Sequence, residues 1–292
     1  MTRRFSTARG REFGVGMRAA LEGASLTGNA AARMLDWDPS KVSNLLNGKG
    51  GVSQLEVAVL LGMCRVNAGE LARLLTLHQD THIRGWWQQH GRCAPVRLHT
   101  VVEHLKVART LTSWHTHMVP LFLQTAHYMR EVLLASSTVP QDEVLDRVQA
   151  QLAMQDVLRL SRTKCTFFIH ELALHLRIGG AEVYVGQLLH LLSMSAWKNV
   201  SIRIVPAALG AHAGLAGSFT HLTLDTYEPL VWVATENSSL FDETPDAVEG
   251  YDNVVRALDD TSWDEETSTA FIASLCDGLP LPDADVPLPP LA

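Results

Sequence analysis

Apolar residues recur at helical spacing through the first 78 residues, and each apolar run ends at a turn signal. Phe13, Met17 and Leu21 share one face of a first helix, which ends at Gly23. In a second helix, Ala31, Met34 and Leu35 are expected to face inward. This second helix is predicted over 28–35 and a third over 39–47. Ser53 is predicted to cap a fourth helix that ends at residue 62, and a fifth begins at residue 67 or 68 and extends to residue 77. The pattern predicts a small domain of five short helices over residues 1–78.

After a segment that resembles a linker, residues 79–97, the pattern becomes mixed. Helical spacing over 98–162, broken at Val119-Pro120, is followed by an alternating aromatic and β-branched run typical of a strand. Strands are predicted over 165–169, 200–205, 217–224 and 230–235, and helices over 184–195, 245–258 and 265–276. The fold class predicted is mainly α with a smaller α/β part: the helical domain, then a larger α+β domain over 98–278. Residues 279–292 contain five prolines, which predicts an extended, mobile tail.

Charge separates the same two regions. Residues 1–78 contain ten Lys or Arg and six Asp or Glu, a net charge of +4, whereas residues 79–292 contain 14 and 25, a net charge of −11. A basic region followed by an acidic body fits a nucleic-acid-binding domain joined to a part with another role. The overall charge of −7 hides this division.

Other features limit the class of protein. The chain has no run of roughly eighteen apolar residues and no apolar stretch after its basic N-terminus, so we expect neither a membrane span nor a signal peptide, and a cytoplasmic location. The cysteines are far apart, which predicts reduced thiols in or near the core rather than disulfides or a zinc site. They are Cys64, Cys93, Cys165 and Cys276.

The third predicted helix has the clearest signals for function. Asp38 is a suitable N-cap, Pro39 suits the first helical position, and Gly48 suits the end. An apolar face of Val42, Leu45 and Leu46 leaves a polar face outward, which matches the helix that enters the major groove in helix-turn-helix proteins. That polar face consists of Ser40, Lys41, Ser43, Asn44 and Asn47.

Each polar side chain suggests a contact. Asn44 suits the edge of an adenine, and Lys41 suits either a guanine or a phosphate. Ser40 and Ser43 suit the DNA backbone. The alternative is a small helical bundle whose polar face is merely solvated.

Residues 27–50 resemble the xenobiotic-response-element helix-turn-helix family, in which Ser-Lys-Val-Ser is a frequent opening of the recognition helix. The family usually has Thr-Gln at the start of the preceding helix, where this chain has Thr27-Gly28-Asn29, so Asn29 would take the glutamine's contact with a shorter reach. The resemblance implies DNA binding through Thr27, Asn29, Ser40, Lys41, Ser43, Asn44, Asn47 and Lys49.

The remainder resembles the large domain fused to such DNA-binding domains in actinobacterial regulators of an antitoxin-like group. The matching segments include Gly85-Trp86-Trp87, residues 119–128 and residues 179–188, although Leu121 stands where the family commonly has Gly. The resemblance implies a transcription regulator, often accompanied by a small partner protein encoded nearby. It implies no particular ligand.

Histidines suggest a competing chemistry. His115 and His117 form an HxH pair, and His170, Glu171 and His175 lie further along the chain. No spacing typical of a metalloenzyme is present, and HxH on a helix would direct the two rings about 200° apart. We therefore expect no metal, no cofactor and no catalytic residue, while residues 164–235 could enclose a small-molecule pocket or form a protein-binding surface.

We expect a homodimer bound to a pseudo-palindromic double-stranded DNA operator, with the C-terminal domain serving for dimerisation and for sensing an effector or partner protein. One alternative is an enzyme of specialised metabolism built on a regulator-derived scaffold. Another, compatible with DNA binding, is an antitoxin-like protein whose acidic body neutralises a small basic partner.

Overall fold

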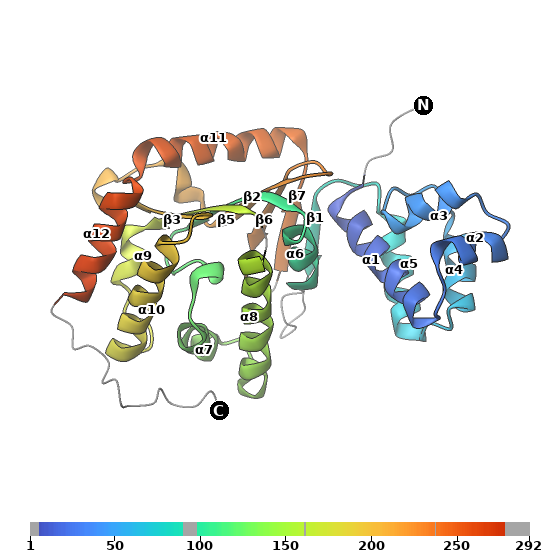
Figure 1. Ribbon diagram of the computed structural model, residues 1–292, viewed down its shortest axis with the longest axis horizontal. Coiled ribbons are helices and arrows are strands. Elements are labelled where there is room, and N and C mark those ends of the chain that lie inside the picture. Colours follow the sequence, from blue (N-terminus) through green and yellow to red (C-terminus); the bar gives the residue numbers. More distant parts are fainter. Residues whose placement is uncertain (1–5, 90–97, 161, 237, 278–292) are drawn as a thin grey trace. The chain divides into compact units, whose positions relative to one another are not determined.

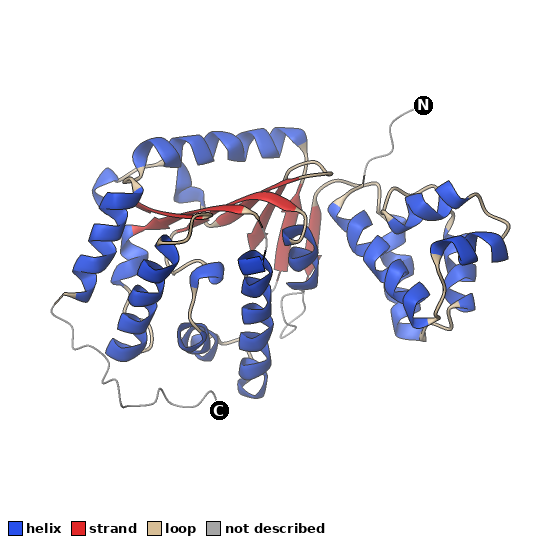
Figure 2. Cartoon of the chain, viewed as in Figure 1, coloured by secondary structure: helices blue, strands red, loops and turns tan. Residues whose placement is uncertain are grey.

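The computed structural model describes residues 6–277 apart from 90–97, 161 and 237. It confirms a mainly helical chain with a smaller α/β part (Figure 2). The described residues divide into two compact units. The N-terminal unit extends to Trp86 and also contains Asp242–Thr244, and the C-terminal unit contains Trp87–Phe241 and the residues from Pro245 onward.

Five helices make up the described N-terminal unit, and the second to the fifth begin close to where the sequence pattern places them. Their buried residues include Phe13, Met17, Leu45, Leu60 and Leu74. Met34, expected to face inward, is 61% exposed, because the second helix is short and buries mainly its alanines. The helices are α1 (Ala8–Gly23), α2 (Gly28–Met34), α3 (Pro39–Leu46), α4 (Gln54–Met63) and α5 (Ala68–Gln79).

Side-chain caps explain these boundaries. The hydroxyl, carboxylate or amide oxygen at each N-cap accepts a backbone N–H from the first turn, which satisfies a donor that the helix itself leaves unpaired. The caps of α1 to α5 are Thr7, Thr27, Asp38, Ser53 and Asn67. Sequence patterning therefore predicted this unit's elements well, since caps are local features.

The C-terminal unit is built on a mixed sheet with the strand order β1-β7-β6-β5-β2-β3-β4. Strands β2, β3 and β4 are parallel, and β5 runs antiparallel to both β2 and β6. The strands are β1 (Trp86–Gln89), β2 (Ala108–His115), β3 (Lys164–His170), β4 (Val200–Val205), β5 (Phe219–Leu224), β6 (Leu230–Ala234) and β7 (Ser238–Asp242).

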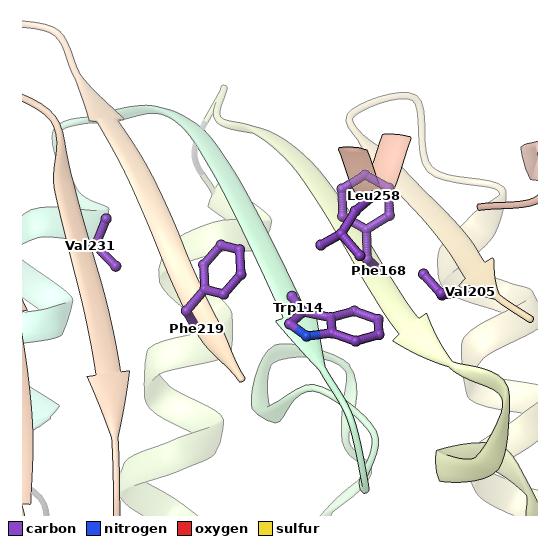
Figure 3. Packing of buried hydrophobic residues seen from close by; sticks show 6 residues of the cluster. All are labelled: Trp114, Phe168, Val205, Phe219, Val231 and Leu258. Carbon is purple, nitrogen blue, oxygen red and sulfur yellow. The ribbon is translucent and has the colours of Figure 1, made fainter. Parts of the chain in front are cut away.

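Helices cover both faces of this sheet (Figures 1 and 2). One face packs against α11 through a cluster that includes Trp114, Phe168, Phe219 and Leu258 (Figure 3). The other face is covered by helices that precede and follow β3. The helices are α6 (Leu98–Leu105), α7 (Ala126–Ala135), α8 (Val144–Leu160), α9 (Glu171–His175), α10 (Gly180–Ser195), α11 (Pro245–Thr261) and α12 (Glu265–Cys276).

The structure also differs from the sequence-based prediction. Residues 108–115, expected to be helical, form β2 in the interior of the sheet, where β3 and β5 pair with it on either side. The expected linker, residues 79–97, contains β1 within its described part, and β7 was not predicted. The four predicted strands and the helices from Gly180 onward are confirmed. Residues 90–97, with Cys93, and the proline-rich tail 279–292 lie outside the described residues.

Candidate nucleic-acid interface

Helices α2 and α3 are joined by a tight turn over residues 35–38. Asp36 adopts a left-handed backbone conformation with φ of 51°, which changes the chain direction after α2. Asp38 then accepts the Ser40 N–H at 2.7 Å, and Pro39 occupies the first position of α3. The Ser40 side chain also hydrogen-bonds this carboxylate, which holds the pKa of Asp38 below its usual value. These local bonds fix where α3 begins.

The opposite end of α3 is held by α1. Gly10 and Gly14 of α1 face the backbone of Gly48 and Leu46 so closely that a Cβ on either α1 glycine would stand 2.4 Å from a carbonyl oxygen. Arg18 donates to the Leu46 carbonyl, and the Ser6 hydroxyl donates to the Asn47 carbonyl at 2.7 Å. On the inner face of α3, the side chains of Val42 and Leu45 are fully buried. The helix is therefore held at both ends and along its inner face.

The outward face of α3 retains polar groups available to a partner. Ser40 and Ser43 are exposed, and Asn44 is partly exposed. Within the described part of the chain, the Asn44 side-chain amide has no hydrogen-bond partner, so its donor and acceptor groups remain available. The Asn47 amide differs, since it donates to the Ser43 carbonyl at 2.8 Å. This bond occupies a backbone acceptor in the last turn of α3.

Lys41 is more constrained than its sequence context suggests. Its ammonium group donates to Glu56 Oε1 and lies 4.6 Å from the centre of the Trp37 ring. Glu56 also completes a capping box with Ser53 at the start of α4. The hydrogen bonds from Lys41 and from Ser53 lower the pKa of Glu56 to about 2. The carboxylate is therefore ionised throughout the neutral range.

The remaining predicted residues lie around α3. The Thr27 hydroxyl accepts the Ala30 N–H at 3.2 Å and so caps α2, while Asn29 and Lys49 are exposed. Sequence reasoning missed Glu56 and Arg18. The Ser-x-x-Glu spacing of residues 53–56 was a signal for the capping box, but its pairing with Lys41 depends on how α3 and α4 are placed.

Histidines also gather at the carboxyl ends of the parallel strands in the C-terminal unit. The rings of His170 and His212 stack with centres 5.5 Å apart, and Trp114 contacts both. His115 ends β2, so the helical geometry assumed for the HxH pair does not apply. No group of three or more potential metal ligands occurs among the described residues, and each of the two stacked rings accepts a backbone N–H through Nδ1.

Three of the four cysteines lie within the described residues. Cys64 and Cys165 are buried and Cys276 is partly buried, and all three are free, as predicted. Among the described residues, no helix combines the length and apolar character needed to cross a membrane.

Comparison with known families concerns the C-terminal unit. Residues 98–274 match the model of a family described as a domain of unknown function, DUF5753. The match covers more than half of the chain, which therefore belongs to this family. Neither a curated protein nor a solved structure matches the chain.

Proposed function

We propose that the protein is a sequence-specific, DNA-binding transcription regulator of the cytoplasm, in which α3 enters the major groove. In this proposal the N-terminal unit is a helix-turn-helix domain of the xenobiotic-response-element family. The C-terminal unit provides dimerisation and senses an effector or a partner protein.

The observation that carries the proposal is that α3 is held rigidly while its outer face exposes polar side chains. Its inner face and both ends are held by α1 and the core, while Ser40, Ser43 and the unpaired Asn44 amide remain on its outer face. A helix that presents short polar side chains from a fixed backbone is what base recognition requires. The net charge of +4 over residues 1–78 supplies attraction to phosphates.

A dimer gives this interface its expected spacing. Two copies of α3 would occupy successive major grooves about 34 Å apart, so the operator would be a pseudo-palindrome. Asn44 would pair with an adenine edge through both amide groups. Ser40 and Ser43 would contact the DNA backbone and set the register.

The experiment is selection of a preferred duplex from a random pool by the full-length protein, followed by fluorescence anisotropy at physiological salt. We expect tighter binding to the selected duplex than to random DNA, and Asn44→Ala to weaken binding about 5- to 150-fold, mainly through one base position. Asn253→Ala, on α11 of the other unit, is the matched control and should bind like the wild type.

Two results would overturn the proposal. One is the absence of binding to any duplex at micromolar protein. The other is an equal loss of selected and random binding in Asn44→Ala, because a base contact must affect one sequence more than another.

A further inference from the structure

We infer that Lys41 recognises a base edge and makes no phosphate contact, and that Glu56 is the positioning residue that imposes this choice. The inference rests on the proposed function and deepens it. It starts from the arrangement of Lys41, Glu56, Ser53 and Trp37, which lies entirely within the N-terminal unit.

The Glu56 carboxylate is fixed through both of its oxygens. Oε2 accepts the Ser53 N–H at 2.8 Å and the Ser53 hydroxyl at 2.9 Å, while Oε1 accepts the Lys41 ammonium. The Glu56 N–H donates back to the Ser53 hydroxyl at 3.3 Å. The position of the carboxylate is thus set by the start of α4, and Lys41 of α3 is drawn to it.

Trp37 restrains the same ammonium group from the turn between α2 and α3. Its ring centre is 4.6 Å from Nζ, within the range of a cation–π contact. The Lys41 side chain nevertheless remains 29% exposed. An ammonium group has three N–H donors, so a donor remains after the bond to Glu56.

Charge decides what that donor can bind. A phosphate approaching Lys41 would also approach the ionised Glu56, so the pair would present no net positive charge. The attraction and counterion release that make phosphate contacts favourable would be lost. The O6 and N7 atoms of guanine are uncharged acceptors, and they can accept an N–H from Lys41 while the ion pair stays intact.

The first test separates the charge of Glu56 from its capping role. Glu56→Gln keeps a side chain able to complete the capping box but removes the negative charge. We expect random-duplex affinity at low salt to rise several-fold, and the slope of log affinity against log salt to steepen by about 0.9, as for one added phosphate contact. Ser53→Ala is the matched control: it disrupts the cap, leaves the ion pair, and should keep the wild-type slope.

The second test addresses the Lys41 donor directly and keeps the net charge of the pair at zero. In the double variant Lys41→Met/Glu56→Gln, which has the same zero net charge as the wild-type pair, we expect affinity for the selected duplex to fall about tenfold, with preference lost at one guanine position and the wild-type salt slope kept. Thermal unfolding of each variant shows whether the domain is folded.

Either of two results would overturn the inference. They are a uniform loss across all duplexes with a slope shallower than that of the wild type in Lys41→Met/Glu56→Gln, or a wild-type slope in a folded Glu56→Gln variant. Both leave DNA binding by the wild type intact. Failure of the wild type to bind any duplex would instead remove the proposed function itself.

Discussion

The carbonyl oxygen of Gly10 lies 2.1 Å from the place that a Cβ atom on Gly48 would occupy. This approach brings α1 directly against the backbone where α3 ends, and it leaves no space for a side chain on either residue. Gly48 also has a φ of 66°, a left-handed conformation that disfavours other residues. The position of α3 relative to α1 therefore depends on two glycines that are distant in the sequence.

Gly48→Ala should lower the free energy of unfolding by about 2–4 kcal/mol, because backbone strain and overpacking add together. Gly50 offers a matched control, since its φ is also 66°, but no atom lies within 4 Å of the position that a Cβ on Gly50 would occupy. Gly50→Ala should cost about 1 kcal/mol from the backbone alone. Urea unfolding measures both values, and equal losses would show that the contact with Gly10 contributes nothing.

Arg11 and Glu243 form a buried ion pair at 3.1 Å, and Glu243 also accepts the Ala8 N–H at the start of α1. Burial raises the pKa of Glu243, although Arg11 and the Ala8 N–H act to lower it. Arg11→Met or Glu243→Gln should each cost about 3–5 kcal/mol, because the remaining group stays buried without the charged group that it hydrogen-bonds.

The double variant Arg11→Met/Glu243→Gln should be less destabilised than the sum of the two single variants, by about 2 kcal/mol. The amide introduced by Glu243→Gln would still provide an oxygen for the Ala8 N–H. Additive losses in chemical unfolding would contradict a coupled pair.

His115 should make stability depend on pH. Burial, with a smaller contribution from His117, lowers the pKa of His115 to about 4. The unfolded chain takes up a proton near pH 6.5, but the folded chain does not until about pH 4, so stability is lost as pH falls through this window. Because residue 115 as a whole retains an intermediate exposure to solvent, the loss attributable to His115 should be on the order of 2 kcal/mol.

His115→Asn removes this titration, so the difference in unfolding free energy between wild type and variant should narrow or reverse from pH 7 to pH 4. Other groups titrate in both proteins and cancel in the comparison. Parallel pH profiles for the two proteins would disprove the role of His115.

Met34 and Leu45 test the assignment of inner and outer faces in α2 and α3. Met34 is 61% exposed and Leu45 is fully buried. Met34→Lys should change the unfolding free energy by less than about 0.5 kcal/mol, whereas Leu45→Ala should cost about 2–5 kcal/mol. A large loss from Met34→Lys would indicate that this side chain is covered in the protein in solution.

The elements of the N-terminal unit could be predicted from sequence because their causes are local. Asp38 and Pro39 fix the start of α3 through contacts with near neighbours, and the left-handed backbone of Gly48 ends it. Strand β2 was missed because its apolar residues, Leu111 and Trp114, also fit a helical spacing. Its identity comes from pairing with β3 and β5, which are distant in the sequence.

In the candidate interface, too, features with local causes could be predicted and those that depend on tertiary structure could not. Which residues of α3 face outward follows from periodicity, so Ser40, Ser43 and Asn44 were predicted to face outward, and they lie at least partly exposed. The pairing of Lys41 with Glu56 depends on tertiary placement of α3 and α4, and no sequence spacing specifies it. The contact of Glu243 with Arg11, 232 positions apart, is still further from any local pattern.

The segment Asp242–Thr244 has a consequence for engineering and for exchange of domains. Residues up to Trp86 form a covalently continuous piece, yet the carboxylate that accepts the first N–H of α1 and balances Arg11 comes from Glu243. A chimera that carries only this first piece on a foreign body would bury a guanidinium without that carboxylate. A functional graft therefore has to supply an acidic residue at the corresponding place, and the minimal transferable module is made of two segments of the chain.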